Sequence, residues 1–147
     1  MFDVASNMKI AKLKAVAEQT AGAANQLEID LAEEGDKGHH ERITDGLIIV
    51  DVTVVGTNGT LDIIVQDYGR DDATWDADFC TVAQITETGV YAIPIKGIRE
   101  KVRLRSTVAT AAITWGAMFV GLNAQRRPVK QSGASFPTLT YAANRKG

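Results

Sequence analysis

Apolar and polar residues alternate repeatedly along this chain. The clearest case is residues 101–108, where Val102 and Leu104 alternate with arginines. A β-strand places successive side chains on opposite faces, so a period of two predicts a strand with one buried face. The pattern predicts strands over residues 27–31, 47–55, 61–66, 79–86, 90–95, 101–108 and 114–122.

Turn residues between these segments refine the prediction. Asn58-Gly59 tolerates the positive φ angles of tight hairpin turns, so residues 47–66 are expected to form an antiparallel hairpin. Pro94 has no backbone N–H to donate to a neighbouring strand. This favours a position at the edge of a sheet or at a strand end for residues 90–95. Residues 114–122 are apolar on both faces. We expect another layer of the domain to cover the second face, with a neighbouring subunit as the alternative.

Short strands separated by turns predict an all-β fold: a β-sandwich of the jelly-roll type with about eight antiparallel strands. Residues 26–122 are predicted to form this sandwich. Residues 1–25 fit either an extended N-terminal arm or a first strand, although part of this segment also fits a loose helical stripe. Residues 123–147 lack sustained periodicity and are predicted to form an extended C-terminal tail.

Charge distinguishes the tail from the rest of the chain. Residues 123–147 contain five basic residues and no acid, whereas the other 122 residues carry 11 basic and 18 acidic groups, a net −7. Five dispersed charges without a recognition motif argue against a nucleic-acid partner. The chain shows neither an export signal nor an apolar stretch long enough for a membrane span, so no membrane association is expected.

Two acidic segments are candidate metal loops. The first contains Glu33, Glu34, Asp36, His39, His40 and Glu41, and the second, residues 67–78, contains Asp71, Asp72, Asp76 and Asp78. Neither matches a known ligand spacing, so both are interpreted as solvated loops, and no metal or other cofactor is expected. Cys80 is the single cysteine and is expected to be a partly buried, inert residue near a strand end.

No motif for catalysis is present: the chain lacks a nucleophile elbow, a phosphate-binding glycine loop, an H-E-x-x-H pair and a Cys/His arrangement. The sequence therefore predicts a protein that is not an enzyme, with no catalytic residues and no small-molecule substrate. The basic row of residues 101, 103 and 105 is expected to form cross-strand ion pairs. Trp75, in the second acidic segment, is expected either to cover the sandwich as a lid or to anchor a partner.

Residues 89–122, GVYAIPIKGIREKVRLRSTVATAAITWGAMFVGL, resemble the jelly-roll decoration (cement) proteins of tailed-phage heads. The resembling pattern is Tyr and Pro in one strand, a basic R-L-R strand, a short turn and a final apolar strand. Upstream, the order of L-x-I-D-L, V-D-V-T-V and T-L-D-I-I-V-Q-D extends the resemblance over residues 20–122.

This resemblance implies a structural virion protein that binds the outer surface of the capsid, as a homotrimer, and bridges major capsid protein subunits. The terminal segments suit attachment to more than one neighbour. Candidate capsid or subunit contacts are Lys12, Lys14, Trp75, Arg126, Arg127, Lys130, Phe136 and Tyr141. The alternatives are another virion component, such as a neck, tail or fibre part, and a carbohydrate-binding β-sandwich module, although the aromatic residues are scattered over several segments.

Overall fold

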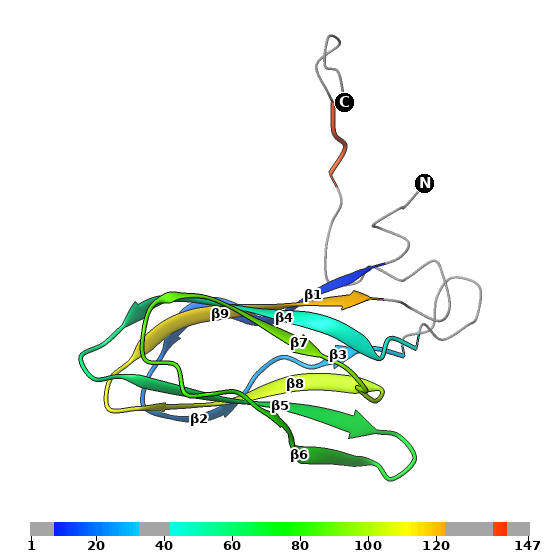
Figure 1. The fold of residues 1–147 in the computed structure, drawn as a ribbon, viewed down its shortest axis with the longest axis horizontal. Coiled ribbons are helices and arrows are strands. Elements are labelled where there is room, and N and C mark those ends of the chain that lie inside the picture. Colours follow the sequence, from blue (N-terminus) through cyan, green and yellow to red (C-terminus); the bar gives the residue numbers. More distant parts are fainter. Residues whose placement is uncertain (1–7, 33–41, 123–136, 141–147) are drawn as a thin grey trace.

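The computed structural model describes residues 8–32, 42–122 and 137–140, which form two antiparallel β-sheets packed face to face (Figure 1). One sheet has the order β1-β9-β4-β7, and the other has the order β2-β8-β5-β6, with β3 also paired to β8. The strands are β1 (Lys9–Gln19), β2 (Gly22–Asn25), β3 (Ile29–Asp30), β4 (Asp45–Val55), β5 (Thr60–Gly69), β6 (Thr74–Thr81), β7 (Gly89–Ile95), β8 (Lys101–Ala109) and β9 (Ile113–Leu122).

This strand order is that of a jelly roll, because the two four-strand paths follow the arrangement of two interlocked Greek keys. The predicted fold class is confirmed. Chain reversals mostly cross from one sheet to the other: β1 leads to β2, β4 to β5, β6 to β7 and β8 to β9. Each reversal therefore passes over an end of the core.

The predicted hairpin over residues 47–66 is wrong, because β4 and β5 lie in different sheets. The turn itself is as expected: Asn58 has a φ of 57° and the Gly59 amide donates to the Gly56 carbonyl at 2.8 Å. However, β4 is flanked by β9 and β7, and β5 by β8 and β6, so neither has a free edge for the other. A turn sequence specifies a local reversal of the chain, but it does not determine which strands pair with each other.

The sandwich begins at Lys9, not at residue 26. Of the two expectations for residues 1–25, the first strand is found: β1 pairs with β9 from Lys9↔Gly121 to Gln19↔Ile113, and β2 pairs with β8. Residues 9–25 are thus part of the domain and not an arm. The described tail residues 137–140 are all exposed and stand apart from the sandwich (Figure 1).

Several strand boundaries also differ from the prediction. The segment predicted as an acidic loop, residues 67–78, is mostly the β5–β6 hairpin, and the strand expected over 79–86 starts at Thr74 and ends at Thr81. The strand expected over 27–31 is reduced to β3, and of its alternating apolar residues Ile29 and Leu31 are buried whereas Leu27 is 54% exposed. Pro94 lies in β7, an edge strand that pairs with β4, as expected.

The core lies between the sheets and is centred on large side chains such as Trp115, Phe119 and Leu13, each 0% exposed. A chain of partly buried hydrogen bonds links the two sheets. Gln19 Oε1 accepts hydrogen bonds from Trp115 Nε1 at 3.1 Å and from Ser106 Oγ at 2.8 Å, and Gln26 Nε2 donates to Ser106 Oγ. These bonds give the buried Trp115 N–H and Ser106 hydroxyl their partners.

Lys14 was expected to contact a partner, but its side chain is buried in its own domain. The β1–β9 register shifts on both sides of Lys14, forming bulges. Lys14 Nζ donates to the carbonyls of Ala15, Ala17 and Trp115 at 2.7–3.0 Å, and lies 4.8 Å from the Trp115 ring centroid. Burial lowers the pKa of the Lys14 amine. Lys14 is therefore a structural residue that stabilises the irregular part of β1.

Replacing Lys14 by Met is expected to reduce the free energy of unfolding by about 1–3 kcal/mol, since three carbonyls lose a charged donor. The exposed neighbour Lys12 provides the matched control, and Lys12→Met should change stability by less than about 0.5 kcal/mol. Urea denaturation followed by tryptophan fluorescence measures both. Equal effects of the two substitutions would contradict the structural role assigned to Lys14.

Candidate functional site

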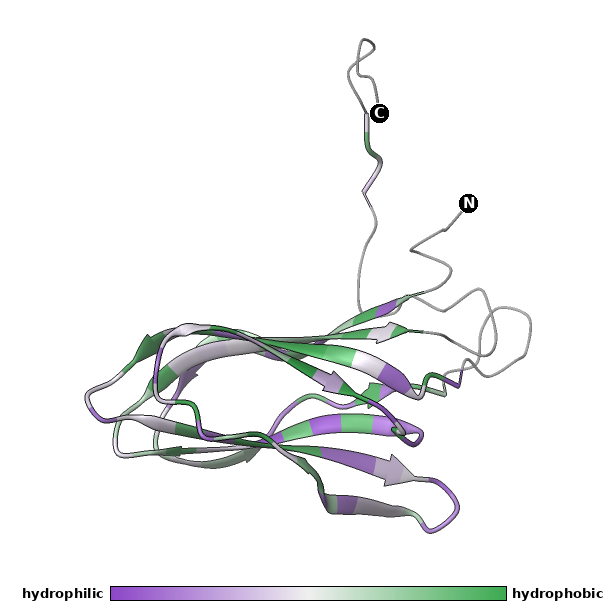
Figure 2. Ribbon diagram, in the orientation of Figure 1, coloured by the Kyte–Doolittle hydropathy of each residue, from purple (hydrophilic) through white to green (hydrophobic). Residues whose placement is uncertain are grey.

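The outer face of the β2-β8-β5-β6 sheet is charged. Along β8, Val102, Leu104, Ser106 and Val108 are buried, so the basic row of residues 101, 103 and 105 points outward. Figure 2 shows the alternation of hydrophilic and hydrophobic residues along this strand. Arg103 Nε donates to Gln66 Oε1 at 2.9 Å and its guanidinium lies 3.7 Å from the Glu28 carboxylate. Arg103 thus takes part in the expected cross-strand pairing, and this face is typical of a solvated sheet surface.

Trp75 lies on this charged face, in β6 opposite Tyr68 of β5, and not in a loop. The two ring centroids are 5.4 Å apart, with planes inclined at 52°. A cation covers each ring: Arg103 lies 4.0 Å from the Trp75 centroid and Lys101 Nζ lies 5.2 Å from the Tyr68 centroid. Trp75 is half-buried, with Tyr68 and Arg103 against its ring. It does not cover the core as a lid.

Arg99 organises the end of the sandwich near the β5–β6 turn. The Asp67 side chain is 2% exposed and accepts the Arg99 backbone N–H at 3.0 Å, Nε at 3.2 Å and Nη2 at 3.1 Å. Arg99 Nη1 also reaches Asp72 at 3.2 Å. These carboxylates raise the pKa of Arg99, with the hydrogen bond to Asp67 as the main cause. A Cβ at position 69 would collide with the guanidinium, so Gly69 makes room for it.

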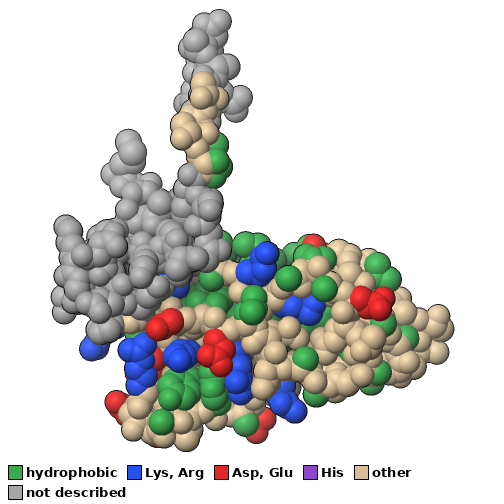
Figure 3. Space-filling model, turned by 180° about the vertical axis from the view of Figure 1, so that it is seen from behind, with side chains coloured by type: hydrophobic (Ala, Val, Ile, Leu, Met, Phe, Trp, Pro, Cys, Tyr) green, Lys and Arg blue, Asp and Glu red, His purple; other side chains and the backbone are tan. Residues whose placement is uncertain are grey.

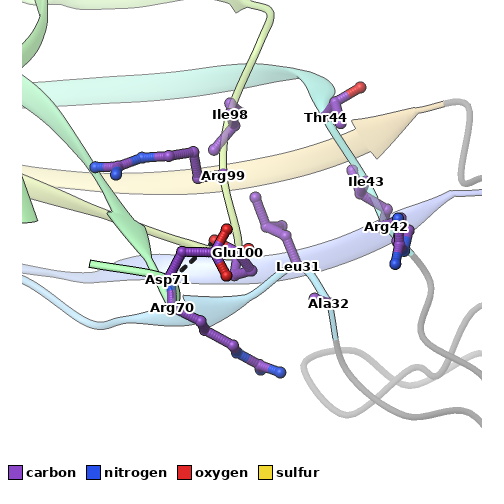
Figure 4. A pocket seen from close by; sticks show the side chains of 10 residues that line it. All are labelled: Leu31, Ala32, Arg42, Ile43, Thr44, Arg70, Asp71, Ile98, Arg99 and Glu100. Atoms are coloured by element: carbon purple, nitrogen blue, oxygen red, sulfur yellow. Dashed lines mark hydrogen bonds between the residues drawn. The ribbon is translucent and has the colours of Figure 1, made fainter. Parts of the chain in front are cut away.

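A hollow of about 440 Å³ opens beside this ion pair, between the strands that end there (Figure 4). Its lining mixes apolar side chains such as Leu31 and Ile98 with Arg42, Arg70 and Glu100. Two of the lining arginines pair with carboxylates outside the lining, Arg70 with Asp30 at 3.0 Å and Arg99 with Asp67 at 3.1 Å, and Glu100 accepts the backbone N–H of Arg70. Lys, Arg, Asp and Glu side chains crowd this end of the molecule (Figure 3). Arginines that already pair with carboxylates support structure more directly than ligand binding.

Within the described parts of the chain, no three His, Cys, Asp or Glu side chains are grouped to hold a metal ion. The first candidate metal loop, residues 33–41, lies outside the described residues. In the second, Asp67 and Asp72 bind Arg99. Cys80 is a free, half-buried thiol next to the end of β6, packed against the core as expected. No helix long and apolar enough to span a membrane occurs in the residues that the structure describes.

The outer face of the β1-β9-β4-β7 sheet is apolar. The strand pairing aligns its outward residues in rows: one row holds Ile10, Val120, Leu47 and Pro94, the next Lys12, Met118, Ile49 and Ala92, and the third Gly116, Asp51 and Val90. We call these three rows the apolar face. The expectation that another layer of the domain covers it is not met by any described residue, since Met118 remains 45% exposed.

The structure describes three of the eight predicted contact residues and separates them. Lys12 is exposed on the apolar face, Trp75 is half-buried on the opposite, charged face, and Lys14 is internal. Sequence reasoning did not assign Arg99 and Asp67 to one site, because they are distant in sequence and each resembles an ordinary surface charge. The remaining predicted contacts lie outside the described residues: Arg126, Arg127, Lys130, Phe136 and Tyr141.

No protein-family model and no curated protein matches this chain. Among solved structures, it is similar to dimeric latent PorU from Porphyromonas gingivalis, with a TM-score of 0.40 and 9% identity over 91% of this chain and 14% of that one. It is also similar to the structure of the infectious bursal disease virus Gt strain, with a TM-score of 0.32 and 14% identity over 84% of this chain and 32% of that one. The chain thus spans less than a third of either.

Replacing Arg99 by Met is expected to lower the free energy of unfolding by roughly 2–4 kcal/mol, because the buried Asp67 carboxylate loses its partner. Arg70→Met is the control: its pair with Asp30 is 43% and 38% exposed, and its loss should cost less than about 1 kcal/mol. Urea denaturation measures the difference in the free energy of unfolding between the two variants, and their m-values should equal that of the wild type. Similar costs for both substitutions would contradict the distinct role of the Arg99 pair.

Proposed function

We propose that this protein is a structural component of a virus particle, which binds the outer surface of a tailed-phage head and stabilises it by bridging major capsid protein subunits. The observation that carries the proposal is the combination of a jelly-roll sandwich with a broad apolar sheet face that the described domain leaves uncovered. A contiguous apolar face of this kind is typical of a protein–protein contact. The sequence resemblance over residues 20–122 supports the same role.

The terminal segments would supply the bridging. β1 starts and β9 ends side by side, at Lys9↔Gly121, so residues 1–8 and 123–147 leave the sandwich at the same end. The C-terminal segment carries five positive charges against −7 on the other 122 residues. Two attachment points on neighbouring capsid subunits slow dissociation more than either contact alone. A homotrimer, which the resemblance implies, would multiply the number of such contacts.

A carbohydrate-binding module is the second candidate, because the structure brings Tyr68 and Trp75 together on one sheet face. Sugar rings stack on flat, open aromatic faces. Here the two rings are inclined at 52°, and Lys101 and Arg103 cover one face of each. This arrangement fits a protein or acidic partner better than a sugar. Binding to a glycan array that Trp75→Ala removes would favour the carbohydrate function instead.

Mass spectrometry of density-purified virus particles from the source of this protein tests the proposal. We expect copies of this chain comparable in number with the major capsid protein, as a lattice-wide decoration requires. A few copies per particle would instead indicate a neck, tail or fibre component. Absence from the particles would contradict a virion role.

Removing residues 126–147 tests the contribution of the tail. The truncated chain is expected to bind purified heads about tenfold or more weakly than the full chain, mainly through faster dissociation, because one of two attachment points is lost. Co-sedimentation with heads measures the affinity. A head affinity unchanged by the truncation would exclude the tail from the contact, while leaving the sandwich as the binding element.

A further inference from the structure

The edges of the two described sheets differ in how they are protected. A strand at a sheet edge carries unpaired backbone N–H and C=O groups, which pair with another extended chain unless the edge is irregular, short or charged. β1 is interrupted by bulges, and the Lys14 ammonium binds two carbonyls of this irregular part. β2 and β3, which share one edge, are only four and two residues long. β6 carries the exposed Asp76 and Asp78.

β7 differs from these three edges. It pairs with β4 on one side, and no described residue pairs with its other side. The strand is seven residues long and contains no charged residue, and Val90 is 70% exposed. Pro94 protects only the last part of the strand. The first five residues of β7 therefore form an open, uncharged edge.

Pro94 also indicates which backbone groups of β7 are free. Antiparallel residue pairs alternate between those that exchange two hydrogen bonds and those whose backbone groups point away from the partner strand. Pro94 is paired with Leu47 although it has no N–H, so this pair is of the second kind. Ala92, two residues earlier, is in the same phase. Its N–H and C=O therefore point to the open edge of the sheet.

We propose that this edge binds the C-terminal tail of a second copy of the chain, which adds to the sheet as a further strand. Residues 131–144 contain no charged residue, and within them threonines alternate with Leu139 and Tyr141, a composition that favours a strand. The described part of this segment, residues 137–140, is exposed and stands apart from its own sandwich (Figure 1). An uncharged tail segment thus matches an uncharged edge, and main-chain hydrogen bonds would supply the affinity.

The tail is long enough for exchange between copies. Pro137 follows Leu122, the last residue of β9, by 15 residues, which gives a reach of up to about 50 Å. The ten residues of β9 span only about 33 Å. A tail that binds the edge of the next copy makes a head-to-tail contact, and such contacts can close into rings. The inference rests on the proposed function only for the size of the ring, which would be a trimer.

Substitutions at the edge and in the tail test the proposal. Ala92→Pro removes the N–H from the open edge and keeps an apolar side chain, and Ala92→Val is the matched control, because it keeps both. Leu139→Pro removes a donor from the tail instead. Sedimentation equilibrium of the full-length chains measures the association constants. We expect the wild type and Ala92→Val to self-associate, and each proline variant to associate about tenfold or more weakly.

An equimolar mixture of the two proline variants distinguishes tail exchange from other contacts. Ala92→Pro retains an intact tail and Leu139→Pro retains an intact edge, so mixing should restore one heterodimer. Since Leu139 lies outside the sandwich and is 66% exposed, Leu139→Pro keeps the test valid if Ala92→Pro destabilises β7.

A wild-type chain that remains monomeric over the concentration range would overturn the proposal. So would equal weakening by Ala92→Val, or a mixture that forms no heterodimer. Self-association of Leu139→Pro as strong as that of the wild type would also overturn it, because the edge would then pair with a strand other than the tail. None of these measurements uses heads, so their failure is distinguishable from a failure of the proposed capsid role.

Discussion

The packing of two sheets around Trp115 is the interaction on which the rest of this structure depends. The indole is 0% exposed, and its N–H is satisfied by Gln19, which also binds Ser106 of the opposite sheet. A buried ring of this size contributes most when its polar atom has a partner, because an unsatisfied N–H would offset part of the apolar gain. The ring and the backbone carbonyl of Trp115 also contact the Lys14 ammonium, at the bulges of β1.

The inner faces of the two sheets form this core, and the outer faces differ in the residues that they present. The β2-β8-β5-β6 sheet presents charges and two aromatic rings that are paired with one another, as a surface in water does. The β1-β9-β4-β7 sheet presents Ile, Leu, Val and Met in aligned rows. A contiguous apolar face of this kind is typical of a protein–protein contact.

Particular residues show how far sequence reasoning reached. Alternation identified β8 and β9 almost to their ends, and the missing N–H of Pro94 favoured a sheet edge or a strand end, of which the structure shows the edge. The same reasoning failed for Asn58-Gly59, where a correct turn joined two sheets and not two paired strands. It also failed for Lys14, because a lysine in an irregular strand resembles a surface residue until the bulges direct its ammonium to internal carbonyls.

The sequence by itself determined the fold class, the two faces of β8 and the charge contrast between the tail and the rest of the chain, because periodicity and composition are local properties. It also showed that β9 is apolar on both faces. Only the tertiary structure decided which strands are neighbours, since any two strands of matching alternation can pair locally. That choice aligned the outward residues of β1, β4, β7 and β9 into one apolar face, and it joined Arg99 to Asp67 across 32 positions of sequence. Long-range pairing depends on the packing of the whole core, and no single segment encodes it.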